Sequence, residues 1–185
     1  ADNIVTFFNK AYDLDTVITI CSNNFGSRQN PEKLIPLTIL RMIKNSYVPL
    51  YGKGKNIRDW IFVEDHCRAI YNALKYGESG QKYLLGTKNE ISNFDLVVMI
   101  SEIFDEYFPT NKPHKKLIKF IEDRKSHDFR YAINPKKSIK EIKFSYKNNF
   151  ESNLRKTINY YLENSDYYMK ILDTDIWFKQ KYNFN

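Results

Sequence analysis

The run of residues 58–66, Arg-Asp-Trp-Ile-Phe-Val-Glu-Asp-His, constrains this chain most. Its centre, 60–63, is apolar and bulky, as a buried strand requires. The following segment, 64–76, has apolar residues at helical spacing. The run therefore predicts a strand that leads directly into a helix. Arg58 stands at the start of that strand, where we expect a ligand-facing cation on a rigid scaffold.

The rest of the chain alternates short β-branched runs with helical patterns, which favours an α/β fold. The expected strands are 16–21, 48–51, 60–63, 81–85 and 118–121, and the expected helices are 2–12, 34–45, 64–76, 92–108, 134–142 and 151–164. The first strand is apolar on both faces, which predicts a central place in a parallel sheet. Gly52 and Gly54 predict a tight turn rather than a phosphate loop. The aromatic tail after Ser165 is expected to pack across its domain.

Composition limits the function further. The 185 residues are 42% hydrophobic, enough for a sizeable core, and contain neither a membrane-spanning run nor an N-terminal signal segment. We therefore expect a cytoplasmic protein. Cys21 and Cys67 are expected to be reduced and buried. The three histidines stand apart from any cluster of metal ligands, so no metal site is predicted.

Several further stretches share one order and spacing with a known family. They are Cys21 to Gly26, Pro31 to Pro36, Tyr51 to Gly54, Asn89 to Asn93, Asp123 to Asp128 and Arg130 to Ile133. Together with the 58–66 run, they resemble the nucleotide-sugar branch of the extended short-chain dehydrogenase/reductases, and within it the dTDP-glucose 4,6-dehydratase family. The resemblance covers nearly the whole chain.

Two hallmarks of that family are absent from the sequence. There is no Gly-x-Gly-x-x-Gly fingerprint, and no Tyr-x-x-x-Lys pair stands in the setting that the family uses. The resemblance thus implies the C-terminal half of a dehydratase. It implies the last strands and helices of a Rossmann-type parallel sheet in 1–28 and 59–90. A smaller α/β substrate-binding domain is implied in 29–58 and 91–185, with the C-terminal tail.

The resemblance also implies a substrate site and a cofactor contact. Arg58 and Arg124 are expected to converge on the diphosphate, since guanidinium groups match phosphate geometry better than ammonium groups do. Asn24 would lie beside NAD, which residues outside this chain would mainly bind. The full set of expected substrate residues is Asn23, Lys33, Leu34, Pro49, Leu50, Tyr51, Arg58, Asn93, Arg124 and His127.

The implied activity is that of an NAD-dependent lyase. It would convert dTDP-glucose to dTDP-4-keto-6-deoxyglucose in deoxysugar (rhamnose-type) biosynthesis, as a homodimer with a dTDP-sugar substrate and with neither nucleic acid nor membrane as a partner. The catalytic Tyr, Lys, Asp and Glu would lie outside this chain, so no catalytic residue is expected here and the isolated chain should be inactive. One departure is visible, because Lys125 and Ser126 stand where the family usually has Pro-Gly, which puts the shape of this loop in question.

Other interpretations stay open at this point. Arg58 could form a surface ion pair with Asp59 or Glu64, and His127 could bond Asp123 or Asp128. Lys33 could simply face solvent, and the two asparagines after the first strand could cap their own turn. The chain could be another nucleotide-sugar epimerase or decarboxylase. The net charge of +7 would also suit a non-catalytic nucleic-acid module, or a solvated surface of no function.

Overall fold

The structure is a computed structural model that describes residues 1–146 and 149–174. The chain divides into two compact units. Unit 1 comprises 1–24, 58–90 and 131–150, and unit 2 comprises 25–57, 91–130 and 151–185.

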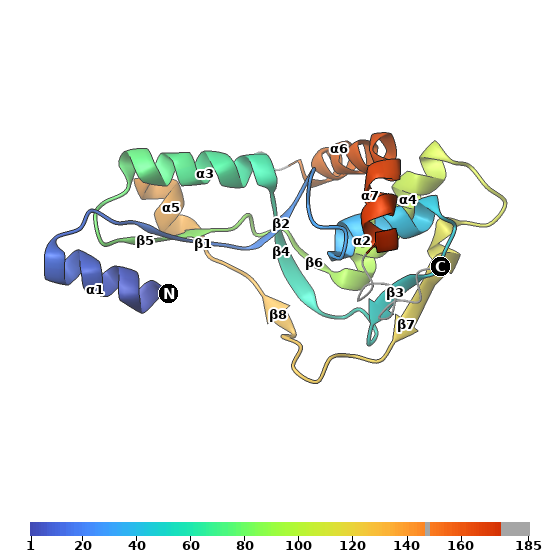
Figure 1. Cartoon of the computed structure of the whole chain (residues 1–185), viewed down its shortest axis with the longest axis horizontal. Coiled ribbons are helices and arrows are strands. Elements are labelled where there is room, and N and C mark those ends of the chain that lie inside the picture. The colour runs from blue at the N-terminus through green and yellow to red at the C-terminus, as the bar shows by residue number, and fades with distance from the viewer. Residues whose placement is uncertain (147–148, 175–185) are drawn as a thin grey trace. The chain divides into compact units, whose positions relative to one another are not determined.

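Unit 1 is built on two parallel strands, β1 (Ile18–Cys21) and β5 (Lys82–Leu85), with Ile18 opposite Lys82. Helix α3 (Val63–Tyr76) contacts both strands and runs along them in Figure 1, and α5 (Lys136–Glu141) contacts β5. Helix α1 (Asp2–Tyr12) has no buried residue. The buried core consists of Ile61, Ala69, Ala73, Tyr83, Leu85, Ile142 and Phe144.

Unit 2 contains a helical cluster and a second pair of parallel strands (Figure 1). The strands are β3 (Val48–Tyr51) and β7 (Ile118–Ile121). The helices are α2 (Leu34–Ile43), α4 (Asn93–Tyr107), α6 (Phe150–Glu163), α7 (Ser165–Thr174) and the short 3₁₀ helix η1 (His114–Leu117). Helix α2 contacts α4, α7 and β3, and α4 contacts η1. Apolar side chains of all four α-helices are fully buried, which gives this unit its core.

Four shorter strands contain the points at which the chain passes from one unit to the other. They are β2 (Asn23–Phe25), β4 (Ile57–Phe62), β6 (Glu90–Ser92) and β8 (Arg130–Tyr131). They pair in the order β2-β4-β6, with β8 also paired to β4.

Local signals in the sequence account for the start and end of α4. The hydroxyl of Ser92 accepts a hydrogen bond from the backbone N–H of Asp95 at 3.0 Å, and Ser92 Oγ lies 2.6 Å from Asp95 Oδ2. This N-cap satisfies a backbone donor that the first helical turn leaves unpaired. Helix α4 ends before Pro109, which cannot continue it.

The predicted α/β order with parallel strands is confirmed, and the expected long helices are all present. Strands β2, β6 and β8 and helix α7 were not predicted. Burial of Tyr168 and Leu172 on α7 confirms the expected packing of the tail as far as Thr174, and the rest of the tail lies outside the described residues. The tight turn at Gly52 is confirmed, since Gly54 N donates to Tyr51 O at 3.0 Å.

Two sequence-based expectations are wrong in the described part of the chain. Strand β1 forms a two-stranded sheet with β5 and is half-buried, so it is not central there. Its β-branched residues follow the pleat but do not specify how many neighbours it has. Both cysteines are free, but Cys21 is only half-buried and Cys67 is exposed on α3. Helical spacing places it on the face of α3 opposite Ala69 and Ala73, which enter the core.

The expected assignment of segments to a cofactor domain and a substrate domain stays a prediction. The predicted segment boundaries at 28, 58 and 90 differ little from the boundaries between the two units. Residues 131–150, however, belong to unit 1, whereas the prediction placed them in the substrate domain. None of the helices in the described residues combines the length and hydropathy of a transmembrane span. Within the same residues, no three His, Cys, Asp or Glu side chains gather as metal ligands would.

Candidate functional site

Three of the expected site positions in unit 2, together with Asp123, meet where β3 and β7 end. Because the strands are parallel, their carboxyl ends lie together, with Tyr51 opposite Ile121. Gly52 N donates to Ile121 O at 2.9 Å and closes this edge. The carboxyl ends of parallel strands are where ligands bind in open α/β sheets. Tyr51, Asp123, Arg124 and His127 lie around this end, and we call them the Tyr51 corner.

The ring of Tyr51 is the centre of this corner. The guanidinium carbon of Arg124 lies 4.5 Å from the ring centroid, a distance at which a cation is attracted to the ring face. The His127 ring meets the same tyrosine edge-on, with centroids 6.4 Å apart and an interplanar angle of 83°. A guanidinium and an imidazole are thus presented beside one aromatic ring.

Asp123 fixes the loop that carries Arg124 and His127. Its Oδ1 accepts from the backbone N–H of Arg124 at 2.8 Å and lies 2.7 Å from Nδ1 of His127. The hydrogen bond from His127, and then that from the Arg124 backbone, hold the pKa of the Asp123 carboxyl below its usual value. The carboxylate orients the imidazole, since a hydrogen bond at Nδ1 determines which ring nitrogen carries the proton. This contact is the alternative that the sequence offered for His127.

A glycine is required opposite Asp123. A Cβ atom on Gly52 would lie 2.8 Å from Oδ2 of Asp123, and its φ of +56° is a conformation that other residues rarely adopt. The turn therefore lets the β3 end approach the Asp123 loop closely. This is a structural role, in agreement with the expectation that the two glycines form a turn and not a phosphate loop.

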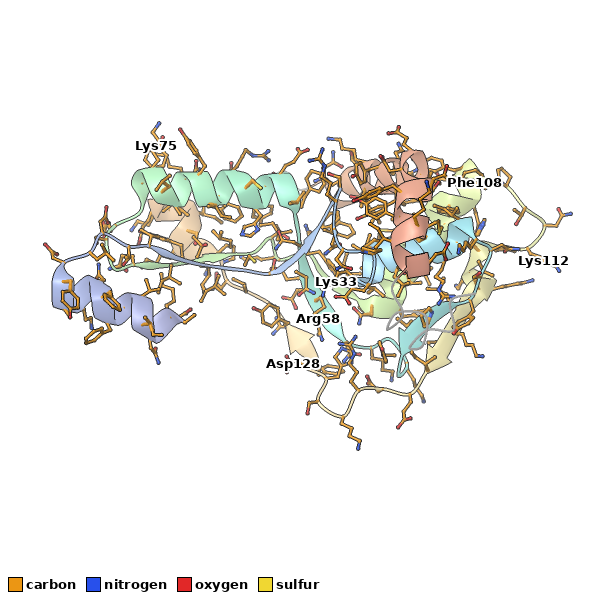
Figure 2. All side chains as sticks on the ribbon, viewed as in Figure 1. Lys33, Arg58, Lys75, Phe108, Lys112 and Asp128 are labelled. Atoms are coloured by element: carbon orange, nitrogen blue, oxygen red, sulfur yellow. The ribbon has the colours of Figure 1, made fainter. Side chains whose placement is uncertain are left out.

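Asn93 joins the same region through a residue that sequence reasoning missed. The buried Asn56 accepts a hydrogen bond from Asn93 N at its carbonyl (2.9 Å), and its side-chain Nδ2 donates to Asp128 O at 3.2 Å. Asn56 thus connects the start of α4 to the end of the Asp123 loop. Figure 2 shows Asp128 on that loop. The only signal in the sequence is a small amide among charged residues before an apolar strand.

The Lys125-Ser126 substitution does not force an unusual backbone. Non-glycine residues with positive φ in the described chain are Asp13, Arg28, Asn45, Lys88 and Lys143. Lys125 and Ser126 are not among them, so both have a φ that any L-residue adopts. In place of a Pro-Gly turn, hydrogen bonds from the Arg124 backbone and the His127 ring to Asp123 hold the loop.

The other expected site residues of unit 2 lie apart from the contact between Arg124 and the Tyr51 ring. Pro49 and Leu50 are buried, so they support the strand and do not expose their side chains. Lys33 is the N-cap residue of α2, and Leu34 begins the helix (Figure 2). The Lys33 side chain is 57% exposed and pairs with Glu32 at 2.9 Å, as its solvent-facing alternative predicted. Among the described residues, no hydrogen bond joins Lys33 to the Tyr51 corner.

In unit 1, three hydrogen-bond contacts hold the side-chain amide of Asn24. Its Nδ2 donates to Ser22 O and to Cys21 Sγ, both at 3.2 Å, and its Oδ1 lies 2.8 Å from Nδ1 of His66. The first contact is the self-capping turn that the sequence left open. Because the oxygen accepts, His66 carries its proton on Nδ1. Burial lowers the pKa of His66 below 6.5, which favours the neutral ring. Asn23 precedes it at the start of β2.

Arg58 is half-buried on β4, followed by the fully buried Asp59. The Asp59 carboxylate accepts from Thr87 N at 3.1 Å, and Thr87 Oγ1 lies 3.0 Å from it. These bonds anchor the strand that carries Arg58 (Figure 2) to the end of β5. Arg58 belongs to unit 1 and Arg124 to unit 2, so their convergence on one diphosphate stays a prediction.

Comparison with known proteins identifies the family. A family model described as GDP-mannose 4,6 dehydratase matches residues 1–157. The dTDP-glucose 4,6-dehydratase of Shigella flexneri is 40% identical over 184 residues, which are 98% of this chain and 51% of the relative. That of Neisseria gonorrhoeae is 42% identical over 169 residues, 89% of this chain and 49% of the relative. The chain thus spans about half the length of the curated relatives it matches.

Solved structures agree with this assignment. The dTDP-glucose 4,6-dehydratase of Bacillus anthracis in complex with NAD superposes with a TM-score of 0.83 at 38% identity, covering 92% of this chain and 52% of that one. The enzyme of the same name from Streptomyces venezuelae gives 0.83 at 32% identity, covering 90% and 49%. A UDP-glucose 4-epimerase of Thermotoga maritima, 21% identical with a TM-score of 0.78, shares the fold. The predicted resemblance to dTDP-glucose 4,6-dehydratases and the Rossmann-type fold are confirmed, and the chain belongs to the GDP-mannose 4,6 dehydratase family.

Proposed function

We propose that this chain forms the nucleotide-sugar-binding part of an NAD-dependent dTDP-glucose 4,6-dehydratase, a lyase that converts dTDP-glucose to dTDP-4-keto-6-deoxyglucose. The relatives of that name, at about 40% identity over nearly the whole chain, support the substrate class. The observation that carries the proposal is the placement of Arg124 and His127 around Tyr51 at the carboxyl ends of β3 and β7.

The Tyr51 corner suits the nucleotide end of such a substrate. A diphosphate requires cations with fixed donors, and the guanidinium of Arg124 presents a planar fork of N–H groups. The Tyr51 ring orients that fork before any ligand arrives, so less conformational entropy is lost on binding. We assign Arg124 and His127 to the phosphates, Tyr51 to the nucleoside, and Asn93 to the wall beside them.

The remaining assignments rest on the resemblance alone. Arg58 is proposed to contact the diphosphate as the second guanidinium, and Asn23, Lys33 and Leu34 the sugar. Pro49 and Leu50 support the nucleoside contact from within the core, because both are buried. None of the described residues is proposed as a catalytic acid, base or nucleophile.

The proposed contact of this chain with NAD is small. Asn24 fits such a role because three contacts with Cys21, Ser22 and His66 fix its amide in advance. The sequence offers no Gly-x-Gly-x-x-Gly cradle for the dinucleotide. Bound NAD would supply the hydride acceptor and donor of the reaction. The chain's own part is to hold the nucleotide so that remote binding energy positions the sugar.

We further propose that the whole protein acts as a cytoplasmic homodimer and that this chain alone is inactive. Neither nucleic acid nor a membrane is a proposed partner. Incubation of the whole protein with NAD and dTDP-glucose, followed by mass spectrometry, tests the activity. The expected product has lost one water. GDP-mannose and UDP-glucose are the comparison substrates. If the protein turns over either one faster than dTDP-glucose, the proposed substrate is wrong.

A further inference from the structure

Unit 2 contains a cavity of about 530 Å³ that the proposed function does not use. It lies where α2 and α4 end, and its apolar lining comes from Met42, Ile43, Phe104, Phe108 and Leu162. Pockets that hold small molecules commonly have volumes of several hundred Å³ and mostly apolar walls. None of the residues assigned to the nucleotide or the cofactor lines this cavity.

The aromatic part of the lining favours a flat ligand. Phe104 and Phe108 lie with ring centroids 5.2 Å apart, and the Phe104 ring meets the His114 ring edge-on at 5.0 Å. Offset and edge-to-face arrangements of this kind are how aromatic rings attract one another. Phe108 is 47% exposed, so the ring is accessible from solvent at the rim.

The polar part of the lining carries positive and neutral groups. Lys112 lies on the connection between α4 and η1, and Figure 2 shows it together with Phe108 at this end of unit 2. Asn45, Thr110 and Asn111 complete the rim. No Asp or Glu is among the described residues that line the cavity. A ligand with a negative group is therefore favoured over a cation.

His114 is fixed in this wall by an acidic residue behind it. Asp105 Oδ1 accepts from the backbone N–H of His114 at 2.9 Å and lies 2.6 Å from its Nδ1. The carboxylate therefore accepts a hydrogen bond from Nδ1–H. The other ring nitrogen, Nε2, is not engaged by this carboxylate. His114 is only 7% exposed, so this orientation is held by packing as well. A buried histidine with an assigned tautomer is a polar group that can orient a ligand.

We propose that this cavity binds a small aromatic anion, a flat ring bearing a carboxylate or sulfonate. The ring would lie against Phe104 and Phe108, and the anionic group would face Lys112. The proposal is independent of the nucleotide site, because it uses other residues and a different end of the helices.

Methionine methyl groups give a site-specific test. The sequence contains three methionines, Met42, Met99 and Met169, of which only Met42 lines the cavity. Naphthalene-2-sulfonate should shift the ¹³C-methyl resonance of Met42 in the full chain in a saturable manner and leave the other two in place. Its neutral analogue, naphthalene-2-methanol, should bind several-fold more weakly.

Two charge-reversed variants provide the matched comparison. Lys112→Glu should weaken the sulfonate about fivefold, the scale of one exposed ion pair, while Lys115→Glu, an exposed lysine that does not line the cavity, should leave the affinity unchanged. Both changes are at the surface and should not unfold the chain. An unmoved Met42 signal at millimolar probe, equal shifts of all three methyl groups, or equal losses in both variants would overturn the proposal.

Discussion

The guanidinium group of Arg124 lies over the ring of Tyr51, 4.5 Å from its centroid. The two residues are brought together by the parallel pairing of β3 and β7, which ends at Tyr51 and Ile121. Asp123 holds the backbone and the histidine of the same loop. The arrangement is therefore determined by the fold, which orients the guanidinium group against the ring.

Replacing the Tyr51 ring should weaken nucleotide binding through Arg124. Tyr51→Leu removes a cation–π contact of about 0.5–1 kcal/mol at an exposed site, which corresponds to a two- to fivefold rise in Kd for dTDP. Tyr51→Phe keeps the ring face and should bind nearly as the unchanged protein does. Calorimetric titration of both variants checks this. An equal loss in Tyr51→Phe and Tyr51→Leu would mean that the hydroxyl, and not the ring, is the contact.

His66 should make unit 1 less stable in mild acid. Burial lowers its folded-state pKa below the ordinary 6.5, so the unfolded chain binds a proton first as the pH falls. The contribution of neutral His66 to stability is complete above pH 6.5 and is lost as the pH falls through the folded pKa. Urea unfolding at a series of pH values measures this, with His66→Gln as the control. If the variant keeps the same pH dependence, another group is responsible.

The buried Asp59 should contribute to the stability of the strand that carries Arg58. Asp59→Ala leaves the Thr87 N–H without its acceptor, at a cost of about 1–3 kcal/mol in free energy of unfolding. Asp59→Asn retains one oxygen and should lose less. Equilibrium urea denaturation of the two variants gives the values. A loss below about 0.5 kcal/mol in Asp59→Ala, the range of ordinary surface changes, would contradict the assigned role.

The sequence predicted the elements of the Tyr51 corner but not their contact. The β3 and β7 runs were visible because their residues are β-branched or apolar, and Arg124 and His127 entered through the family resemblance. Nothing in either run specifies which strand is its neighbour, so the meeting of Tyr51 with Arg124 could not be derived. The bond between His127 and Asp123 could be foreseen, because it is local.

Short elements and buried polar residues were harder to predict. Strands β2, β6 and β8 have two or three residues each, too few for a periodic pattern, and exist only because a partner pairs with them. Helix α7 was missed although Tyr168 and Leu172 stand four residues apart, because a helix of ten residues shows few repeats of that spacing. Asn56 acts through its backbone carbonyl and through one hydrogen bond from its side-chain amide. The residue type alone does not predict either contact.

The most direct test of the proposed site compares dTDP with thymidine, which lacks the phosphates. Calorimetry on the whole protein should show that Arg124→Ala weakens dTDP binding by about 1.5–3 kcal/mol, the scale of hydrogen bonds to charged groups, and leaves thymidine affinity unchanged. Arg58→Ala should lose about 2–3 kcal/mol on the same ligand, and Lys125→Ala should lose little on either. Unchanged dTDP affinity in Arg124→Ala, or an equal loss for both ligands, would contradict the assignment of this guanidinium to the diphosphate.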